Sequence, residues 1–134
     1  MTPPLEQPGD LQLAVLRVLW ERGELTVTDV QAALETEHRD LAQTTVATVL
    51  TRMERRGMVS HRTQGRQFIY TAEITEDDLR SSTLDHVMDR MFGGDVAELV
   101  NHLLSSKDIA PGDLARVKTL IESRQRKGGP RHDR

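Results

Sequence analysis

The segment between residues 42 and 57 has the most distinctive chemistry in this sequence, and that chemistry suits contact with DNA. With about 100° of rotation per residue, a helix would place four apolar side chains on one narrow stripe. These are Val46, Val49, Leu50 and Met53. The opposite side and its flanks would carry the polar residues Thr44, Thr45, Thr48, Thr51, Arg52 and Arg55, with Gln43 near the start of the helix.

The four threonines within eight residues need a physical reason, because β-branched side chains lose freedom in a helix and form helices poorly. A DNA major groove offers one. Short hydroxyl side chains let a helix approach base edges closely, and threonine methyl groups can contact thymine methyl groups. Arginines further along would reach phosphates or guanine edges. The alternative is a β-branched helix tolerated for packing, and the pattern favours the DNA-reading face.

The residues before this helix predict the rest of a helix-turn-helix. A first helix is expected from Asp10, which can cap it, to about Arg22, with Trp20 as a core anchor and Gly23 as its end. A short extended piece at residues 25–27 then leads into a second helix, ending around residues 37–38. Thr26 and Asp29 have the spacing of a capping box at its start. Two helices joined by a short turn, the second exposing contact residues, form this motif.

After Gly57 the pattern changes to that of a β-hairpin. Residues 58–63 and 67–71 are rich in strand-forming residues and flank the turn Gln64-Gly65-Arg66. This hairpin would be the wing of a winged helix. Arg62 and Arg66 near its tip are placed to touch phosphate or an adjacent minor groove, although charged tips also serve solubility alone.

Composition narrows the class of protein. The net charge is −3, yet residues 52–66 hold five arginines against one glutamate, a local charge of +4 that suits phosphate binding. There is no cysteine, no glycine-rich phosphate loop, no nucleophile elbow and no acid/base pair, so we expect neither an enzyme nor a cofactor. The histidines lack zinc-site spacing. No secretory signal and no membrane-spanning run is present, which predicts a cytoplasmic protein without membrane insertion.

Three amphipathic helices are expected downstream, at residues 76–92, 95–105 and 111–124. They total fewer than fifty residues, which is too few for an isolated core. We therefore expect them to pack against a second subunit rather than fold back on their own winged helix. The predicted dimerisation residues are Leu84, Val87, Met88, Met91, Phe92, Leu99, Val100, Leu103, Leu104, Leu114, Val117, Leu120 and Ile121.

The predicted fold class is therefore mainly α with a small β-hairpin wing: an N-terminal winged helix-turn-helix and a C-terminal helical dimerisation lobe. The expected divisions are a flexible arm at residues 1–9, a DNA-binding domain at 10–73, a dimerisation domain at 74–124 and a disordered basic tail at 125–134.

The order and spacing of several short motifs resemble the penicillinase-repressor (BlaI/MecI) family, whose relatives include CopY-type copper-responsive repressors. The resemblance covers roughly residues 9–122. Its landmarks are Gly9-Asp10-Leu11, Val18-Leu19-Trp20, Thr44-Thr45-Val46, Thr48-Val49-Leu50, Arg56-Gly57-Met58-Val59, Gly65-Arg66 before Tyr70, and Phe92-Gly93-Gly94.

The resemblance implies a homodimeric bacterial repressor of a palindromic double-stranded DNA operator, often controlling β-lactamase genes. In antibiotic-responsive members a membrane sensor protease triggers cleavage within the dimerisation lobe. The corresponding peptide here is Asn101-His102, where relatives have Asn-Phe. Gln43 stands where relatives commonly carry Tyr, which could shift operator preference. The cysteine motif of the copper-responsive relatives is missing.

The sequence leaves two rival functions open. A winged helix used only for protein–protein contacts predicts partner binding that is insensitive to salt. A metal-dependent repressor, for example one using His86 between Asp85 and Asp89 with ligands from a partner subunit, predicts DNA binding altered by a chelator.

Overall fold

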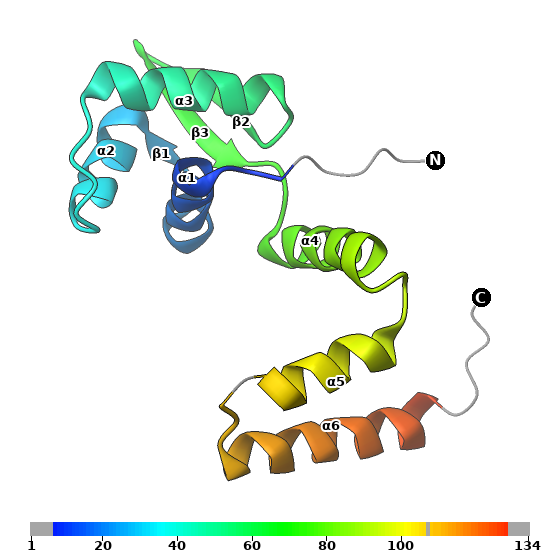
Figure 1. The fold of residues 1–134 in the computed structure, drawn as a ribbon. Coiled ribbons are helices and arrows are strands. Elements are labelled where there is room, and N and C mark those ends of the chain that lie inside the picture. Colours follow the sequence, from blue (N-terminus) through cyan, green and yellow to red (C-terminus); the bar gives the residue numbers. More distant parts are fainter. Residues whose placement is uncertain (1–6, 107, 129–134) are drawn as a thin grey trace. The chain divides into compact units, whose positions relative to one another are not determined.

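The computed structural model describes residues 7–106 and 108–128. The chain divides into two compact units, the first ending at Val87 and the second beginning at Met88. The first unit contains α1 (Asp10–Arg22), β1 (Leu25–Thr26), α2 (Val27–Glu35), α3 (Gln43–Arg55), β2 (Val59–Gln64) and β3 (Gln67–Ala72). It also holds most of α4 (Glu76–Met91), which runs across the division. The second unit contains α5 (Val96–Ser106) and α6 (Pro111–Gly128) (Figure 1).

The core of the first unit is formed by the apolar faces of its helices. Leu16 from α1, Leu34 from α2 and Leu50 from α3 are fully buried. Val46 and Met53 lie beside Leu50, so the apolar stripe predicted for α3 is confirmed, with Val49 at its partly buried edge. Burial of such side chains contributes about 1.5–3 kcal/mol each. This stripe holds α3 in place and turns its other face to solvent.

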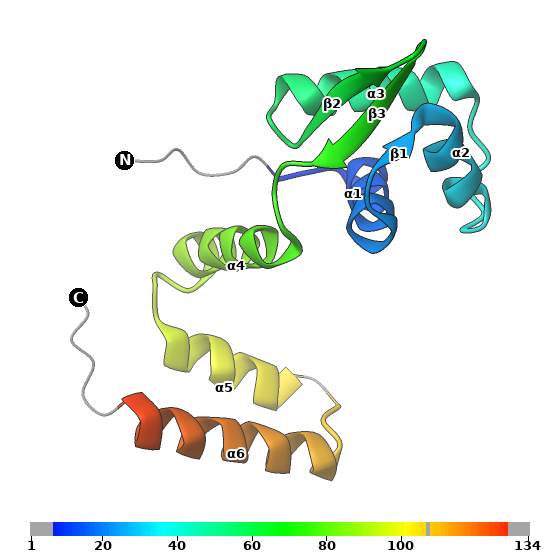
Figure 2. The same cartoon turned by 180° about the vertical axis from the view of Figure 1, so that it is seen from behind.

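The sheet is antiparallel, with strand order β1-β3-β2. Leu25 of β1 pairs with Tyr70 of β3, and His61 of β2 pairs with Tyr70 from the other side. Figure 2 shows the hairpin of β2 and β3 running beside α3. A three-helix unit with this hairpin is a winged helix, and the predicted fold class is confirmed.

Local hydrogen bonds set where the helices start. Thr26 Oγ1 accepts from the Asp29 amide at 3.1 Å and Asp29 Oδ2 accepts from the Thr26 amide at 3.2 Å, which confirms the predicted capping box of α2. At α1 the prediction was wrong by one residue, since Gly9 is the N-cap and Asp10 opens the helix. An acidic side chain is favourable in that first turn because the helix dipole is positive there.

The turn between α2 and α3 is held by side-chain and backbone contacts. Gln31 Nε2 donates to the Leu41 carbonyl at 2.8 Å, and the Arg39 amide donates to the Leu34 carbonyl at 3.0 Å. His38 adopts φ +64°, a left-handed conformation that closes the end of α2. α2 ends at Glu35, slightly before the predicted end.

Trp20 connects the winged helix to the start of α4. Its indole Nε1 donates to the Ile74 carbonyl at 2.8 Å, and Leu79 of α4 belongs to the core cluster. Gln7 is also held on α4, by hydrogen bonds with Ser82 and Thr83. The compact unit thus extends to Val87, beyond the domain end predicted at residue 73.

In the second unit, two glycines end α4 as predicted. Gly93 and Gly94 have φ +55° and +81°, and the Gly94 amide donates to the Met88 carbonyl at 2.9 Å. α6 continues to Gly128, so the prediction of disorder from residue 125 was wrong for 125–128. Basic residues in this last turn stabilise the helix, because the C-terminal end of a helix dipole is negative. The rest of the predicted tail, 129–134, and most of the predicted arm, 1–6, lie outside the described residues.

Candidate nucleic-acid interface

The outward face of α3 presents short polar side chains followed by arginines. Gln43, Thr44, Thr45, Thr48 and Thr51 are exposed. Arg52, which directly follows Thr51, and Arg55 are also exposed. All seven residues predicted on α3 are therefore exposed to solvent, with the arginines towards the C-terminal end of the helix.

Two of these threonines direct their hydroxyl groups back to the helix. Thr48 Oγ1 donates to the Thr44 carbonyl at 3.0 Å, and Thr51 Oγ1 donates to the Ala47 carbonyl at 2.9 Å. A hydroxyl hydrogen used in this way is not available to a ligand. Each of these threonines can then offer an acceptor lone pair and a methyl group.

A polar contact joins α3 to the hairpin, and a row of rings lies along the hairpin beside that contact. His61 Nδ1 lies 2.7 Å from Glu54 Oε1, and the His61 ring stacks on Phe68 with a centroid separation of 4.0 Å. Tyr70 lies edge-on to Phe68, with its ring centroid 6.3 Å away. Burial, with the nearby charge of Glu54, raises the pKa of the Tyr70 hydroxyl. These contacts orient the wing relative to α3.

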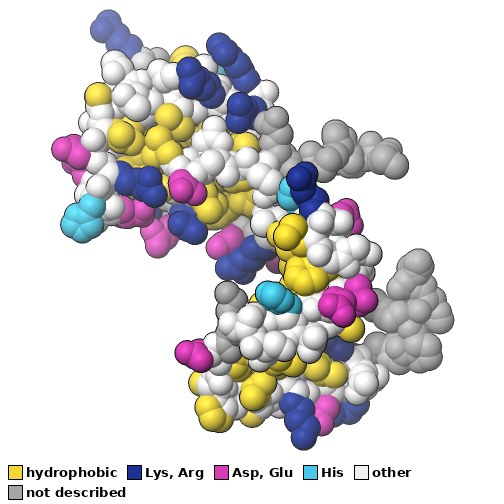
Figure 3. All heavy atoms as spheres, in the orientation of Figure 1, with side chains coloured by type: hydrophobic (Ala, Val, Ile, Leu, Met, Phe, Trp, Pro, Cys, Tyr) yellow, Lys and Arg dark blue, Asp and Glu magenta, His cyan; other side chains and the backbone are white. Residues whose placement is uncertain are grey.

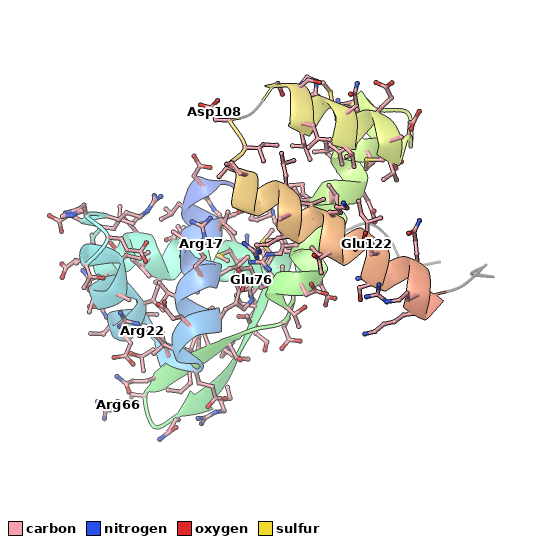
Figure 4. All side chains as sticks on the ribbon, turned by 90° about the horizontal axis from the view of Figure 1, so that it is seen from below. Arg17, Arg22, Arg66, Glu76, Asp108 and Glu122 are labelled. Carbon is pink, nitrogen blue, oxygen red and sulfur yellow. The ribbon has the colours of Figure 1, made fainter. Side chains whose placement is uncertain are left out.

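Arg66 lies at the tip of the wing. Gly65 adopts φ +64°, which favours glycine because it lacks a Cβ, and this conformation closes the turn between β2 and β3. Figure 4 shows Arg66 at this tip. In Figure 3, Lys and Arg side chains gather over α3 and the hairpin tip, and acidic side chains appear lower on the same unit. In this view the basic side chains on this edge have no acidic side chains among them, whereas those lower on the unit lie beside acidic ones.

Arg62 differs from the other predicted contact residues. Its guanidinium forms an ion pair with Glu24, with Nη2 2.9 Å from Oε1, and donates from Nη1 to Gln64 Oε1 at 2.8 Å. Arg62 follows His61 in β2 and pairs with Ile69 of β3. Because successive side chains of a strand point to opposite faces, Arg62 lies on the face of the sheet away from the rings near α3. The structure thus does not bring Arg62 together with Arg66 and the α3 face.

Sequence reasoning missed three residues beside this surface. Thr28 accepts a hydrogen bond from Gln43 Nε2 at 2.9 Å. Phe68 is 47% exposed next to α3, and Glu24 holds Arg62. An aromatic residue in the wing was visible in the sequence, but its exposure was not. The contacts of Glu24 and Thr28 depend on residues 38 and 15 positions away.

The apolar residues predicted for dimerisation gather on the helices after the wing. In the second unit, the described residues include no buried side chain, and α5 and α6 expose large apolar groups (Figure 3). These are Val96, Val100, Leu103, Leu104, Leu114, Val117, Leu120 and Ile121, each between 38% and 64% exposed. Met91 is 73% exposed and Leu84 50%, while Val87, Met88, Phe92 and Leu99 are partly buried.

Asn101 and His102 lie within α5, and both are exposed. The His102 ring is edge-on to Phe92, with centroids 6.0 Å apart, and the His102 carbonyl accepts from Ser106 Oγ at 2.5 Å. The peptide bond that the family resemblance points to is therefore part of a helix.

The described residues include no group of three His, Asp or Glu side chains that could hold a metal ion. Within residues 7–106 and 108–128, no helix has the length and apolar character needed to cross a membrane.

Comparison with known proteins agrees with the predicted family. The Penicillinase repressor family matches residues 8–123. The transcriptional regulator BlaI of Mycobacterium tuberculosis is 32% identical over 127 residues, covering 81% of this chain and 91% of that protein. The penicillinase repressor of Bacillus licheniformis is 23% identical over 118 residues, covering 88% and 91%.

A solved structure is also similar to the first part of the chain. It is the solution structure of the Bacillus licheniformis BlaI monomeric form in complex with the blaP half-operator, 30% identical with a TM-score of 0.47. The match covers 55% of this chain and 89% of that one. With the family match over residues 8–123, the sequence shows that this chain belongs to the penicillinase repressor family, whose members are transcriptional repressors and not enzymes.

Proposed function

We propose that this chain is a homodimeric transcriptional repressor that acts in the cytoplasm and binds a palindromic operator. The observation that supports this most directly is the outward face of α3, where exposed threonines are followed by Arg52 and Arg55. The single acidic residue of α3, Glu54, is engaged by His61. A helix with this surface suits the major groove.

The residues divide into two roles. Thr44, Thr45 and Thr48 are short enough to let α3 approach base edges, and we assign them to base reading. Arg52, Arg55 and Arg66 are assigned to phosphates, which give affinity without sequence preference. Arg62, which the sequence placed in this second group, is assigned instead to the ion pair with Glu24.

Dimerisation is supported by the state of the second unit. Its described residues bury no side chain, yet α5 and α6 expose a series of leucines and valines. Water-exposed apolar surface of this extent indicates a partner, and a second copy would place two α3 helices on two half-sites. The expected half-site separation is one helical turn of DNA, ~34–36 Å, or a multiple of it.

The genes that we propose for regulation are of the β-lactamase type or related stress-response genes, because the relatives are penicillinase repressors. Relief by a membrane sensor protease would require cleavage at Asn101-His102. Loss of the dimer lobe would leave each chain bound to a single half-site, without the avidity of binding two half-sites at once. Cleavage inside α5 also needs local unfolding of that helix. Mass spectrometry of the chain from β-lactam-treated cells tests this route, and an intact chain in induced cells rejects it.

Binding of the purified protein to its own upstream DNA tests the proposed function directly. Titration against salt and against a scrambled duplex should give tight, competitor-resistant binding with one dimer per dyad. Binding that is weak and lost to the scrambled competitor would reject a sequence-specific repressor. Salt-insensitive binding of a protein partner would support the protein-interaction alternative.

A further inference from the structure

A hollow of about 310 Å³ lies beside α3, at the point where α2 begins and β3 passes. Its wall is supplied by β1, α2, α3 and β3 and by the turn before β3. The residues that matter here are Thr28 of α2, Gln43, Ala47 and Thr51 of α3, Arg66 of the turn and Phe68 of β3.

The polar part of this hollow is suited to an anion. Arg66 supplies a positive charge, and none of the lining residues is acidic. Gln43 Nε2 donates to Thr28 Oγ1, so the Thr28 hydroxyl accepts there and retains its own hydrogen for donation. The second N–H of the Gln43 amide is retained as well. Two neutral donors and one cation therefore line the same hollow.

The apolar part of the hollow that matters here is the ring of Phe68. Phe68 is 47% exposed, although a phenylalanine on a hairpin normally gains from burial. Its stacking on His61, at an interplanar angle of 19°, holds the ring in one orientation. An exposed, fixed aromatic face beside anion donors suits a ligand that is charged on one side and apolar on the other.

The hollow is continuous with the proposed base-reading surface. Ala47 and Thr51 also line a second hollow of about 310 Å³, together with Thr48, Arg52 and Arg55. The two hollows are thus neighbours along the outward side of α3. A DNA strand beside α3 would pass over both of them on its way towards the wing.

We propose that the hollow lined by Thr28, Gln43, Arg66 and Phe68 holds one sugar–phosphate unit of the DNA backbone. The phosphate faces Thr28, Gln43 and Arg66, and the deoxyribose packs on Phe68. This inference rests on the proposed function and deepens it. It adds Thr28 and Phe68 to the contact surface, and it assigns Gln43 to the backbone instead of the bases.

The proposed phosphate site can be tested with DNA duplexes in which a single phosphate is replaced by an uncharged methylphosphonate. The replacement is moved one position at a time along the duplex identified from the upstream region. With the wild-type dimer, one replacement per half-site should weaken binding about tenfold. With Thr28→Val or Arg66→Gln, the same replacement should cost much less, because its partner is already gone. Arg55→Gln is the control and should keep the full loss at that phosphate.

The outcomes separate cleanly. If the same methylphosphonate replacement causes a smaller loss of affinity in both Thr28→Val and Arg66→Gln, the result supports the proposed phosphate site. If either variant shows the full wild-type loss of affinity at every phosphate position, the proposed phosphate site is wrong. If the wild-type protein does not bind the upstream DNA specifically, the proposed function has failed before the scan begins, so the two failures are distinct.

Phe68 gives a second test. Phe68→Ala should weaken binding to operator and unrelated duplexes alike, by about threefold to tenfold, with the salt dependence unchanged because no charge is removed. Phe68→Leu should lose less. Thermal unfolding and hydrodynamic size confirm that each variant is folded and dimeric. Unchanged affinity in a folded Phe68→Ala protein overturns the sugar contact.

Discussion

The guanidinium of Arg62 lies against the carboxylate of Glu24, with Nη2 2.9 Å from Oε1 and Nε 3.4 Å from Oε2. The hydrogen bond and the charge of Arg62 lower the pKa of Glu24 below its ordinary value of 4.5, and Glu24 raises the pKa of Arg62. Because the carboxylate pKa is lowered, the pair is present at neutral pH and is lost as the pH falls through that lowered value. Both side chains are exposed, so the pair adds little stability. Its consequence is that Arg62 is already occupied, whereas Arg66 stands at the wing tip.

Arg66→Gln and Arg62→Gln should therefore have different effects on DNA binding. Loss of Arg66 should weaken binding to all sequences and reduce the salt slope by about one unit, because one phosphate contact disappears. Loss of Arg62 should leave the salt slope nearly unchanged. Fluorescence anisotropy at several salt concentrations measures both, and the two variants are matched in charge and both lie in the wing. An equal fall in slope for Arg62→Gln would show that Arg62 leaves Glu24 for a phosphate.

Replacement of Thr48 should alter base preference more than overall affinity. Its hydroxyl hydrogen is used on the Thr44 carbonyl, so the methyl group is a principal feature that it can present to a base. Thr48→Val, which keeps a methyl group, should change the preference less than Thr48→Ser, which removes it. Competition among operators with single base changes measures the preference. A uniform loss of affinity over all operators, as expected for Arg66→Gln, would contradict the base-reading role.

Tyr70 should titrate above its ordinary pKa of 10.0, because burial disfavours the phenolate and Glu54 repels it. A raised folded-state pKa means that this contribution to stability is present below pH 10 and is lost as the pH rises through the folded-state value. Tyr70 is the only tyrosine of the chain, so phenolate absorbance reports it directly. Glu54→Gln should lower the midpoint, because it removes the charge that repels the phenolate. A midpoint at or below 10.0 in the folded wild-type protein contradicts the burial effect.

Charges placed in the apolar surface of α5 or α6 should prevent dimerisation. Leu103→Glu and Leu120→Glu would each bury an unpaired carboxylate in the proposed interface, which is costly. Sedimentation should show monomers, and operator affinity should fall because only one half-site is held at a time. Glu98→Gln, a change at an exposed polar position of α5, is the control and should remain dimeric. Dimers that persist in both leucine variants would place the interface elsewhere.

The elements of the winged helix were largely predictable because their signals are local. The stripe of Val46, Leu50 and Met53 follows directly from helical periodicity, and the capping pair of Thr26 and Asp29 needs only three-residue spacing. The end of α6 was misjudged because good helix formers at 125–127 extend the helix beyond its last apolar residue. The role that we propose for the α3 face also rests on composition, since threonines replace the usual charged residues there.

The sequence by itself determined that α3 has an apolar side and a threonine–arginine side, because a helix imposes its periodicity on whatever residues it contains. Only the tertiary structure decided which wing arginine is available, since the pairing of β1, β3 and β2 places Arg62 beside Glu24, 38 residues away. The same packing brings Thr28, Gln43 and Phe68 to one hollow. Contacts between distant residues depend on strand register and helix packing, which no local pattern specifies.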